Sequence, residues 1–299
     1  MADTMMASGG RTTAISGTGN RASTRSTRKK KTQMLSPKKF IDWVMTKAVP
    51  KDKGFEAGCA ELYRDCYLDT PTFNNFFKDA NKEKNVSKSV WLYDSTRVIV
   101  PDVDYYHASW VDGVKPLTYI LAQAPATPEA AKDFFKLLAH VKAEGLIIAE
   151  AGDEFSKHIS TTFTPLASEG KKKSSEKIDD VLTCTINEQG VKNLKTVRFH
   201  RWAESISAVE LVDMMEKTRK FLGCPLKGPL VIVCKDGAAK SGLVCFLDIE
   251  SDRIAKHGRV RATETVKMIR LMRFNAFDTF ESFDLGINGV LELCNRKKK

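Results

Sequence analysis

One stretch of the sequence decides the fold that we predict, and it reads PLVIVCKDGAAKSGLVCFL over residues 229–247. Its first part is apolar and rich in valine and isoleucine, which is typical of a buried strand that ends at Cys234. A short loop of mostly small residues follows, and an apolar helix begins at Ser241. Such a junction gathers several backbone N–H groups at the positive end of a helix. The pattern therefore favours an anion-binding site, for phosphate above all.

The cysteine at the end of this strand is the candidate for chemistry. Beside a cluster of N–H groups we expect a lowered pKa for Cys234, whose thiolate would attack a bound phosphoryl group. Two other interpretations stay open. In one, Cys234 is simply a buried core residue, as free cysteines usually are. In the other, Ala239-Lys240-Ser241 ends a nucleotide-binding loop, although that motif needs glycine where this chain has Ala239 and Cys234.

The rest of the chain alternates segments of strand length and helix length. Apolar patterns predict strands at about 98–100, 118–123, 146–149, 159–163, 181–185 and 196–199. Helices are predicted from Ser36, near 57–68 and 72–82, from Thr127, at 208–221 and 241–256, and twice more after 262. The interleaving predicts one α/β (α+β) domain over residues 36–299, with a central mixed twisted sheet flanked by helices. Residues 36–83 would form its helical N-terminal extension.

The first 35 residues differ in composition from the rest. Residues 1–39 hold nine basic side chains against one acidic side chain, Asp3, so this part carries +8 of the net charge of +11. Few large apolar residues occur at 1–35, which predicts a disordered basic tail. The Arg28–Lys31 run is of a kind that binds nucleic acid, acidic lipid or a nuclear import receptor, and a solubilising tail is the plainer interpretation.

Composition also excludes several kinds of protein. The seven cysteines have no metal-ligand spacing, so we expect neither a zinc site nor a disulfide framework, and no cofactor. No apolar run has the length of a signal-peptide core or of a membrane span, so we expect no transmembrane segment. The chain is therefore predicted to be cytoplasmic, with nuclear import through the basic tail as an alternative.

Several motifs, in order, resemble one family. Cys-x-x-Gly-x-x-Lys-Ser-Gly at 234–242 resembles the Cys-x-x-Gly-x-x-Arg-[Ser/Thr]-Gly loop of protein tyrosine phosphatases. Segments 94–98, 104–111, 119–125 and 133–135 are similar to further segments of that family, as is the Arg-x-x-Arg-x-x-Ala pattern at 270–276. The chain is identified as resembling a divergent, non-receptor-like member. The resemblance implies that family's fold and a phosphotyrosine protein or peptide as its ligand.

The resemblance also implies roles for the residues around Cys234, which stands at the nucleophile position. Lys240 replaces the arginine that grips phosphate, and lysine offers a point charge where arginine offers a planar fork. Ser241 matches a hydroxyl that helps the thiolate depart, with a helix N-cap as its alternative role. The residues of the phosphate-binding loop would be Lys235, Asp236, Gly237, Ala238 and Ala239.

Other parts of the family's site are replaced. Trp202-Ala203-Glu204 stands where the family has Trp-Pro-Asp, so Glu204 is either the general acid or an ordinary exposed carboxylate. Ser87 stands where an aromatic ring would stack on phosphotyrosine. Asp278 stands at a glutamine position of the substrate pocket. Asp278 and Asp236 would repel a phosphate if they point inward.

Three functions follow as hypotheses. We expect a pseudophosphatase in signalling, which binds phosphotyrosine or a partner protein without useful hydrolysis. The main alternative is a slow or specialised phosphatase that forms a cysteinyl-phosphate, with Cys234 as nucleophile, Lys240 as clamp and Glu204 as acid. The third is a fold used only for protein association, or for nucleic-acid contact through the tail.

Overall fold

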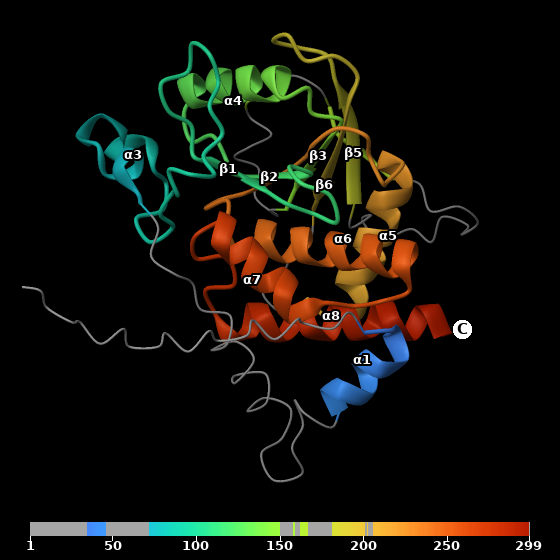
Figure 1. Cartoon of the computed structure of the whole chain (residues 1–299). Coiled ribbons are helices and arrows are strands. Elements are labelled where there is room, and N and C mark those ends of the chain that lie inside the picture. Colours follow the sequence, from blue (N-terminus) through green and yellow to red (C-terminus); the bar gives the residue numbers. More distant parts are fainter. Residues whose placement is uncertain are drawn as a thin grey trace, which may run out of the picture. The chain divides into compact units, whose positions relative to one another are not determined.

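The computed structural model describes residues 35–45, 72–149, 158, 162–166, 181–200, 202 and 206–298 (Figure 1). Most of the predicted tail, the predicted helix at 57–68 and the candidate acid Glu204 lie outside these residues. Leu35, the last residue of the predicted tail, pairs with Val260 in an isolated bridge.

The sheet has seven strands in the described part of the chain, in the order β1-β2-β7-β3-β6-β5-β4. The four central strands β2, β7, β3 and β6 are parallel, and the pairs β1–β2, β5–β6 and β4–β5 are antiparallel, so the predicted mixed sheet is confirmed. Their bounds are β1 Ala108–Val111, β2 Tyr119–Gln123, β3 Gly145–Ile148, β4 Thr164–Pro165, β5 Val181–Ile186, β6 Leu194–Phe199 and β7 Leu230–Cys234.

Helices cover both faces of the sheet. Figure 1 shows α4 (Pro128–His140) on one face, and α5 (Ala208–Leu222), α6 (Ala239–His257), α7 (Ala262–Met272) and α8 (Phe280–Lys298) on the other. Successive side chains of a strand point to opposite faces of the sheet, so β2 contributes residues to the hydrophobic core on each face. Ile120 and Ala122 pack in the cluster of α4, whereas Tyr119 and Leu121 pack in the cluster of α5–α8. A short helix, α1 (Pro37–Trp43), packs on α8.

The start signals read from the sequence are confirmed at two helices. The Ser36 hydroxyl accepts from the Lys39 amide before α1, and the Thr127 hydroxyl accepts from the Ala130 amide before α4. Both helices also begin with proline, whose fixed φ suits the first helical position. Local side-chain capping therefore sets these two boundaries, which is why sequence alone located them.

Three expected elements differ from the structure. The strand predicted at 159–163 is absent at 162–163, the part of it that the structure describes, and β4 begins only at Thr164. The predicted helix at 72–82 is split into α3 (Asn74–Phe77) and a 3₁₀ helix (Asp79–Lys84), because Lys78 between them is extended, with ψ of 135°. The predicted strand at 98–100 is wrong. Only isolated bridges form there, because the chain turns back at Asp102 (φ 62°) and the Val103 amide donates to the Val100 carbonyl.

Among the described residues, no helix is both long and apolar enough to cross a membrane.

A buried ion-pair network joins α5 to α6. The Arg219 guanidinium of α5 contacts Asp248 and Asp252 of α6, whose side chains are 5% and 9% exposed. The Tyr119 hydroxyl of β2 donates to the other oxygen of Asp248 at 2.7 Å. Burial raises the pKa of Asp248, while the Arg219 charge opposes that rise. Asp248 therefore depends on Arg219 as its cation, whereas Asp252 is also paired with Lys256 at 3.6 Å.

We expect Arg219→Ala to lower the free energy of unfolding by about 3–5 kcal/mol, because it leaves the buried Asp248 without a cation and leaves Asp252 with Lys256 alone, 3.6 Å away. Arg296→Ala is the matched control, since Arg296 contacts Asp213 and Glu216, whose side chains are about half exposed. That change should cost about 0–1 kcal/mol. Urea unfolding measures both, and equal losses would contradict the assigned role of the buried network.

Candidate active site

The loop predicted from the sequence lies at the carboxyl edge of the parallel strands. β7 ends at Cys234 between β2 and β3, and the Cys234 carbonyl accepts from the Ala124 amide at 2.9 Å. The helix α6 begins at Ala239, five residues later. Open α/β sheets place their ligands at this edge, outside the carboxyl ends of the strands. The strand, loop and helix are therefore arranged as the sequence predicts.

The Cys234 sulfur is enclosed by the protein. Its side chain is buried, with 2% of the residue exposed. Sγ accepts from the Ser241 amide at 3.4 Å and lies 3.3 Å from the Ser241 hydroxyl. It donates to Oδ1 of Asp236 at 3.1 Å. The amide and hydroxyl of Ser241 thus favour a thiolate at this sulfur, whereas the Asp236 carboxylate opposes it.

The expected lowering of the Cys234 pKa is wrong for this structure. Burial, and after it the negative charge of Asp236, raise the pKa of the Cys234 thiol to about 12. The contacts from Ser241 act in the opposite direction but are outweighed. Sequence reasoning weighed the N–H groups of the loop, and it missed that a carboxylate lies beside the sulfur. Cys234 is a neutral thiol at pH 7.

Asp236 points into the loop. Its Oδ1 accepts from the Ala238 amide at 2.8 Å and from the Ala239 amide at 3.1 Å. The Gly237 amide donates to the Cys234 carbonyl at 3.1 Å, so it closes the turn. The backbone N–H groups of Ala238 and Ala239 thus meet an anion, as predicted, but that anion belongs to the chain itself.

Lys240 is directed to the side of the loop. Its Nζ lies 5.8 Å from the centroid of the Trp202 ring, in a cation–π arrangement. Trp202 is buried and stacks on Phe199 at the end of β6. Glu204, two residues beyond Trp202, lies outside the described residues.

Ser241 is the third residue of α6 and is fully buried. The N-cap position belongs to Ala238, which offers no capping side chain, so the alternative role of Ser241 as a helix cap is wrong. The reason is that α6 begins earlier than the apolar pattern suggested. The Ser241 hydroxyl is free to lie beside the sulfur, as the family resemblance implied.

Arg273 holds the loop through hydrogen bonds to its main-chain carbonyls, a role that the sequence analysis missed. Its Nε donates to the Gly237 carbonyl at 2.8 Å, and one of its terminal nitrogens donates to the Asp236 carbonyl at 3.1 Å. The same guanidinium contacts His107 Nδ1 at 2.8 Å and the Ser109 hydroxyl at 3.2 Å. Arg273 is 0% exposed. The only signal for it was its place in the Arg-x-x-Arg-x-x-Ala pattern.

Ser87 follows a segment that is bound beside the loop. Gln123, the register partner of Cys234, accepts from the Val86 amide at 3.1 Å through its side chain and donates to the Lys84 carbonyl at 2.6 Å. Ser87 itself is half-buried, and its hydroxyl lies 3.1 Å from that of Ser89.

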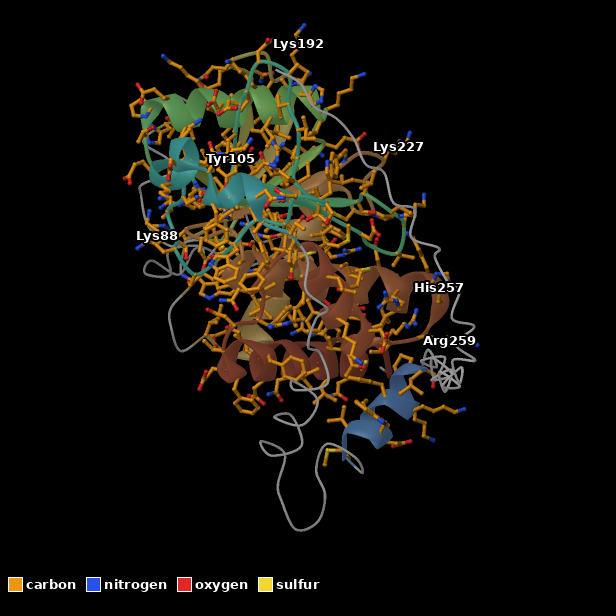
Figure 2. The ribbon with its side chains drawn as sticks, turned by 60° about the vertical axis from the view of Figure 1, so that its left-hand side comes forward. Lys88, Tyr105, Lys192, Lys227, His257 and Arg259 are labelled. Atoms are coloured by element: carbon orange, nitrogen blue, oxygen red, sulfur yellow. The ribbon has the colours of Figure 1, made fainter. Side chains whose placement is uncertain are left out.

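The same segment is held from its other side by Tyr105. In Figure 2 Tyr105 lies among packed side chains, where its hydroxyl donates to Asn85 at 2.6 Å, while Lys88 reaches the surface. The segment that carries Ser87 is therefore fixed by buried contacts on both sides.

Asp278 comes to the same region from the far end of the chain. It follows Ala276 and Phe277, whose carbonyls accept from Arg270 at 2.6 and 2.7 Å. Partial burial, and after it the charge of Asp236, raise the pKa of Asp278. Of the predicted site residues, Ser241 and Asp236 contact the Cys234 sulfur directly, and Asp278 lies close enough to Asp236 to feel its charge. Lys240 contacts Trp202 instead, and Ser87 follows the segment bound to Gln123, so their place in one site with Cys234 stays a prediction.

Gly237 has a conformation and a position that exclude a side chain. Its φ is +69°, and a Cβ would lie 2.4 Å from the backbone of Ala122 and of Gln123. We expect Gly237→Ala to lower the free energy of unfolding by about 3 kcal/mol or more, from left-handed strain and overpacking together. Gly223→Ala is the control, since φ is +81° there with open space around it, and it should cost about 1–2 kcal/mol. Equal losses in thermal unfolding would contradict the steric argument.

We expect the alkylation of Cys234 by iodoacetamide to be slow at pH 7–8 and to keep rising towards pH 12, because only the thiolate reacts. The control is the same residue in urea, where an unperturbed cysteine pKa of about 8.5 should apply. Mass spectrometry of the peptide that contains Cys234 measures both rates. A rate that is already at its plateau at pH 7 in the folded protein would show a lowered pKa instead.

Comparison with known proteins agrees with this geometry. Residues 81–292 match the family model described as protein-tyrosine phosphatase. The chain is 24% identical over 216 residues to human receptor-type tyrosine-protein phosphatase alpha, covering 64% of this chain and 26% of that protein. It is 23% identical over 308 residues to mouse tyrosine-protein phosphatase non-receptor type 9, covering 88% and 49%. The chain therefore spans about a quarter to a half of these relatives.

The fold is also similar to a solved structure. It matches the crystal structure of the catalytic domain of human protein tyrosine phosphatase non-receptor type 18 with a TM-score of 0.66 at 20% identity, covering 80% of this chain and 96% of that one. The family match extends over most of the chain and includes the Cys234 loop, its Arg273 support and the sheet between them. This chain belongs to the protein tyrosine phosphatase family.

Proposed function

We propose that this domain is a pseudophosphatase, which binds a phosphotyrosine-containing protein or another partner protein without useful hydrolysis. The observation that carries this proposal is the place of the Cys234 sulfur, which is buried and lies 3.1 Å from Oδ1 of Asp236, a setting that raises the pKa of the thiol to about 12. Such a raised pKa favours the neutral thiol over the thiolate at pH 7. Because the thiolate is the nucleophile of a cysteinyl-phosphate route, this state removes most of the first chemical step.

The replacement of the phosphate clamp supports the same proposal. A lysine contributes charge but not the two parallel hydrogen bonds of an arginine fork, and Lys240 lies against the Trp202 ring. Loss of a transition-state clamp costs a factor of about 10²–10³ in rate. Lys240 would then serve to attract an anionic partner rather than to stabilise a transition state.

The remaining residues have roles in this proposal that follow from their places. Lys235 and the loop up to Ala239 form the remnant of the phosphate-binding loop. In this proposal Ser87 and Asp278 would line the substrate pocket, where a serine cannot stack on a phenyl ring and a carboxylate repels phosphate. Both replacements weaken the recognition of phosphotyrosine that the family's ordinary residues would give.

A slow or specialised phosphatase is the second candidate, and one observation favours it. The Ser241 amide and hydroxyl still lie 3.4 and 3.3 Å from the Cys234 sulfur, and both act to lower its pKa. In that case Cys234 would form a cysteinyl-phosphate, Lys240 would hold the phosphoryl group, and Glu204 would protonate the leaving phenol.

Hydrolysis of p-nitrophenyl phosphate by the purified chain separates the two candidates. We expect no turnover above that of Cys234→Ser, because the wild-type thiol is not ionised. Cys245→Ser is the matched control, since Cys245 is also a buried cysteine but lies within α6. Turnover that Cys234→Ser abolishes and Cys245→Ser keeps would overturn the pseudophosphatase and support the phosphatase.

A further inference from the structure

The side chain of Asp236 makes three hydrogen bonds within the loop. A single oxygen, Oδ1, accepts from the Ala238 amide, from the Ala239 amide and from the Cys234 thiol, at 2.8, 3.1 and 3.1 Å. Ala238 is the N-cap of α6 and Ala239 its first helical residue. The two amides are among the N–H groups that have no partner within the helix. The carboxylate thus occupies the positive end of α6.

These donors are the ones that an incoming oxyanion would use. Backbone N–H groups at a helix N-terminus bind phosphate, and a carboxylate oxygen has the same charge sign and the same acceptor character. An amide hydrogen that already points at Oδ1 at 2.8 Å has no second strong bond to give. A phosphate oxygen and the Asp236 oxygen therefore compete for one position.

Only the side chain needs to move for that position to open. Arg273 holds the carbonyls of Asp236 and Gly237 at 3.1 and 2.8 Å, so the backbone of the loop is fixed from beneath. Asp236 is itself half-buried, so its carboxylate has access to solvent in another rotamer. A second arrangement, with the carboxylate in water, would therefore differ from the one in this structure at a single side chain.

We propose that Asp236 is an internal ligand of the phosphate-binding loop: its carboxylate fills the oxyanion position, and an oxyanion binds only after that side chain turns out. This rests on the proposed function, because it names what keeps the same loop closed to phosphate. It also distinguishes the two kinds of partner in that proposal, a phosphotyrosine-containing protein and a protein bound without phosphate. The wild-type domain recognises its partner through protein surface, and phosphate contributes only when the loop is open.

The test is the binding of tungstate, a phosphate-like oxyanion, measured by isothermal titration calorimetry. Asp236→Ala should bind tungstate at least about tenfold more tightly than the wild type, because a site that is open in fewer than one molecule in ten loses affinity by that fraction. Asp79→Ala is the matched control. It removes the same charge from a side chain that is 93% exposed, and it should leave the affinity unchanged.

A second variant keeps the test decisive if Asp236→Ala does not fold. Asp236→Asn retains an oxygen that can accept from the Ala238 and Ala239 amides but has no charge, so tungstate should displace it more readily than it displaces the carboxylate. Affinity for tungstate in the wild type equal to that of the folded variants would overturn the proposal.

The rate of Cys234 alkylation shows whether tungstate binds in the loop. In Asp236→Ala, saturating tungstate should slow the alkylation of Cys234 by iodoacetamide, as an anion in the loop covers the sulfur. Tight binding without that protection would place the anion elsewhere and would also overturn the proposal.

The pseudophosphatase proposal and the proposal for Asp236 can fail separately. Turnover by the wild type that depends on Cys234 contradicts the pseudophosphatase, whereas the ratio of wild-type to variant affinity decides the role of Asp236.

Discussion

Arg273 is a fully buried guanidinium at the centre of the site, and the shape of the loop depends on its hydrogen bonds. It donates to the carbonyls of Asp236 and Gly237 and contacts His107 and Ser109 on the strand side. Burial lowers the pKa of Arg273 to about 10, which still leaves the group charged at pH 7. A buried cation of this kind is stable only with several good acceptors, and here the carbonyls of the loop supply them.

This support explains how the fold persists while the chemistry of the site changes. The hydrogen bonds of Arg273 to the loop go to main-chain carbonyls, so they do not require particular side chains at positions 235, 236 and 238–240, and the charge of Asp236 favours the charged form of Arg273. An aspartate at 236 and a lysine at 240 can therefore enter without unfolding the loop. Gly237 is different, because its positive φ and the contact with β2 leave no room for a side chain.

The carboxylates of Asp236 and Asp278 give this site negative charges that act against a bound phosphate. Burial, and after it the charge of Asp236, raise the pKa of Cys234 and of Asp278, so one carboxylate acts on both residues. The positive end of α6 is satisfied by that same carboxylate. Asp236 thus links Cys234, Asp278 and the positive end of α6.

Much of the fold could be predicted from the sequence, because its signals are local. The apolar run 230–234, the proline and hydroxyl caps at Ser36 and Thr127, and the order of the motifs do not depend on distant residues. The 72–82 helix and the 98–100 strand were predicted less well. Their limits are set by the extended backbone at Lys78 and by the turn at Asp102, which their own apolar patterns do not reveal.

The sequence by itself determined that β7, a loop of small residues and α6 follow one another at this edge of the sheet, since the order of strand, loop and helix allows few other arrangements. Only the tertiary structure decided the charge state of the sulfur. That state depends on burial beneath the loop and on the direction of the Asp236 side chain, which Ala238, Ala239 and Cys234 set through hydrogen bonds of about 3 Å. A residue's type is written in the sequence, whereas the dielectric and the neighbours that set its pKa exist only once the chain has folded.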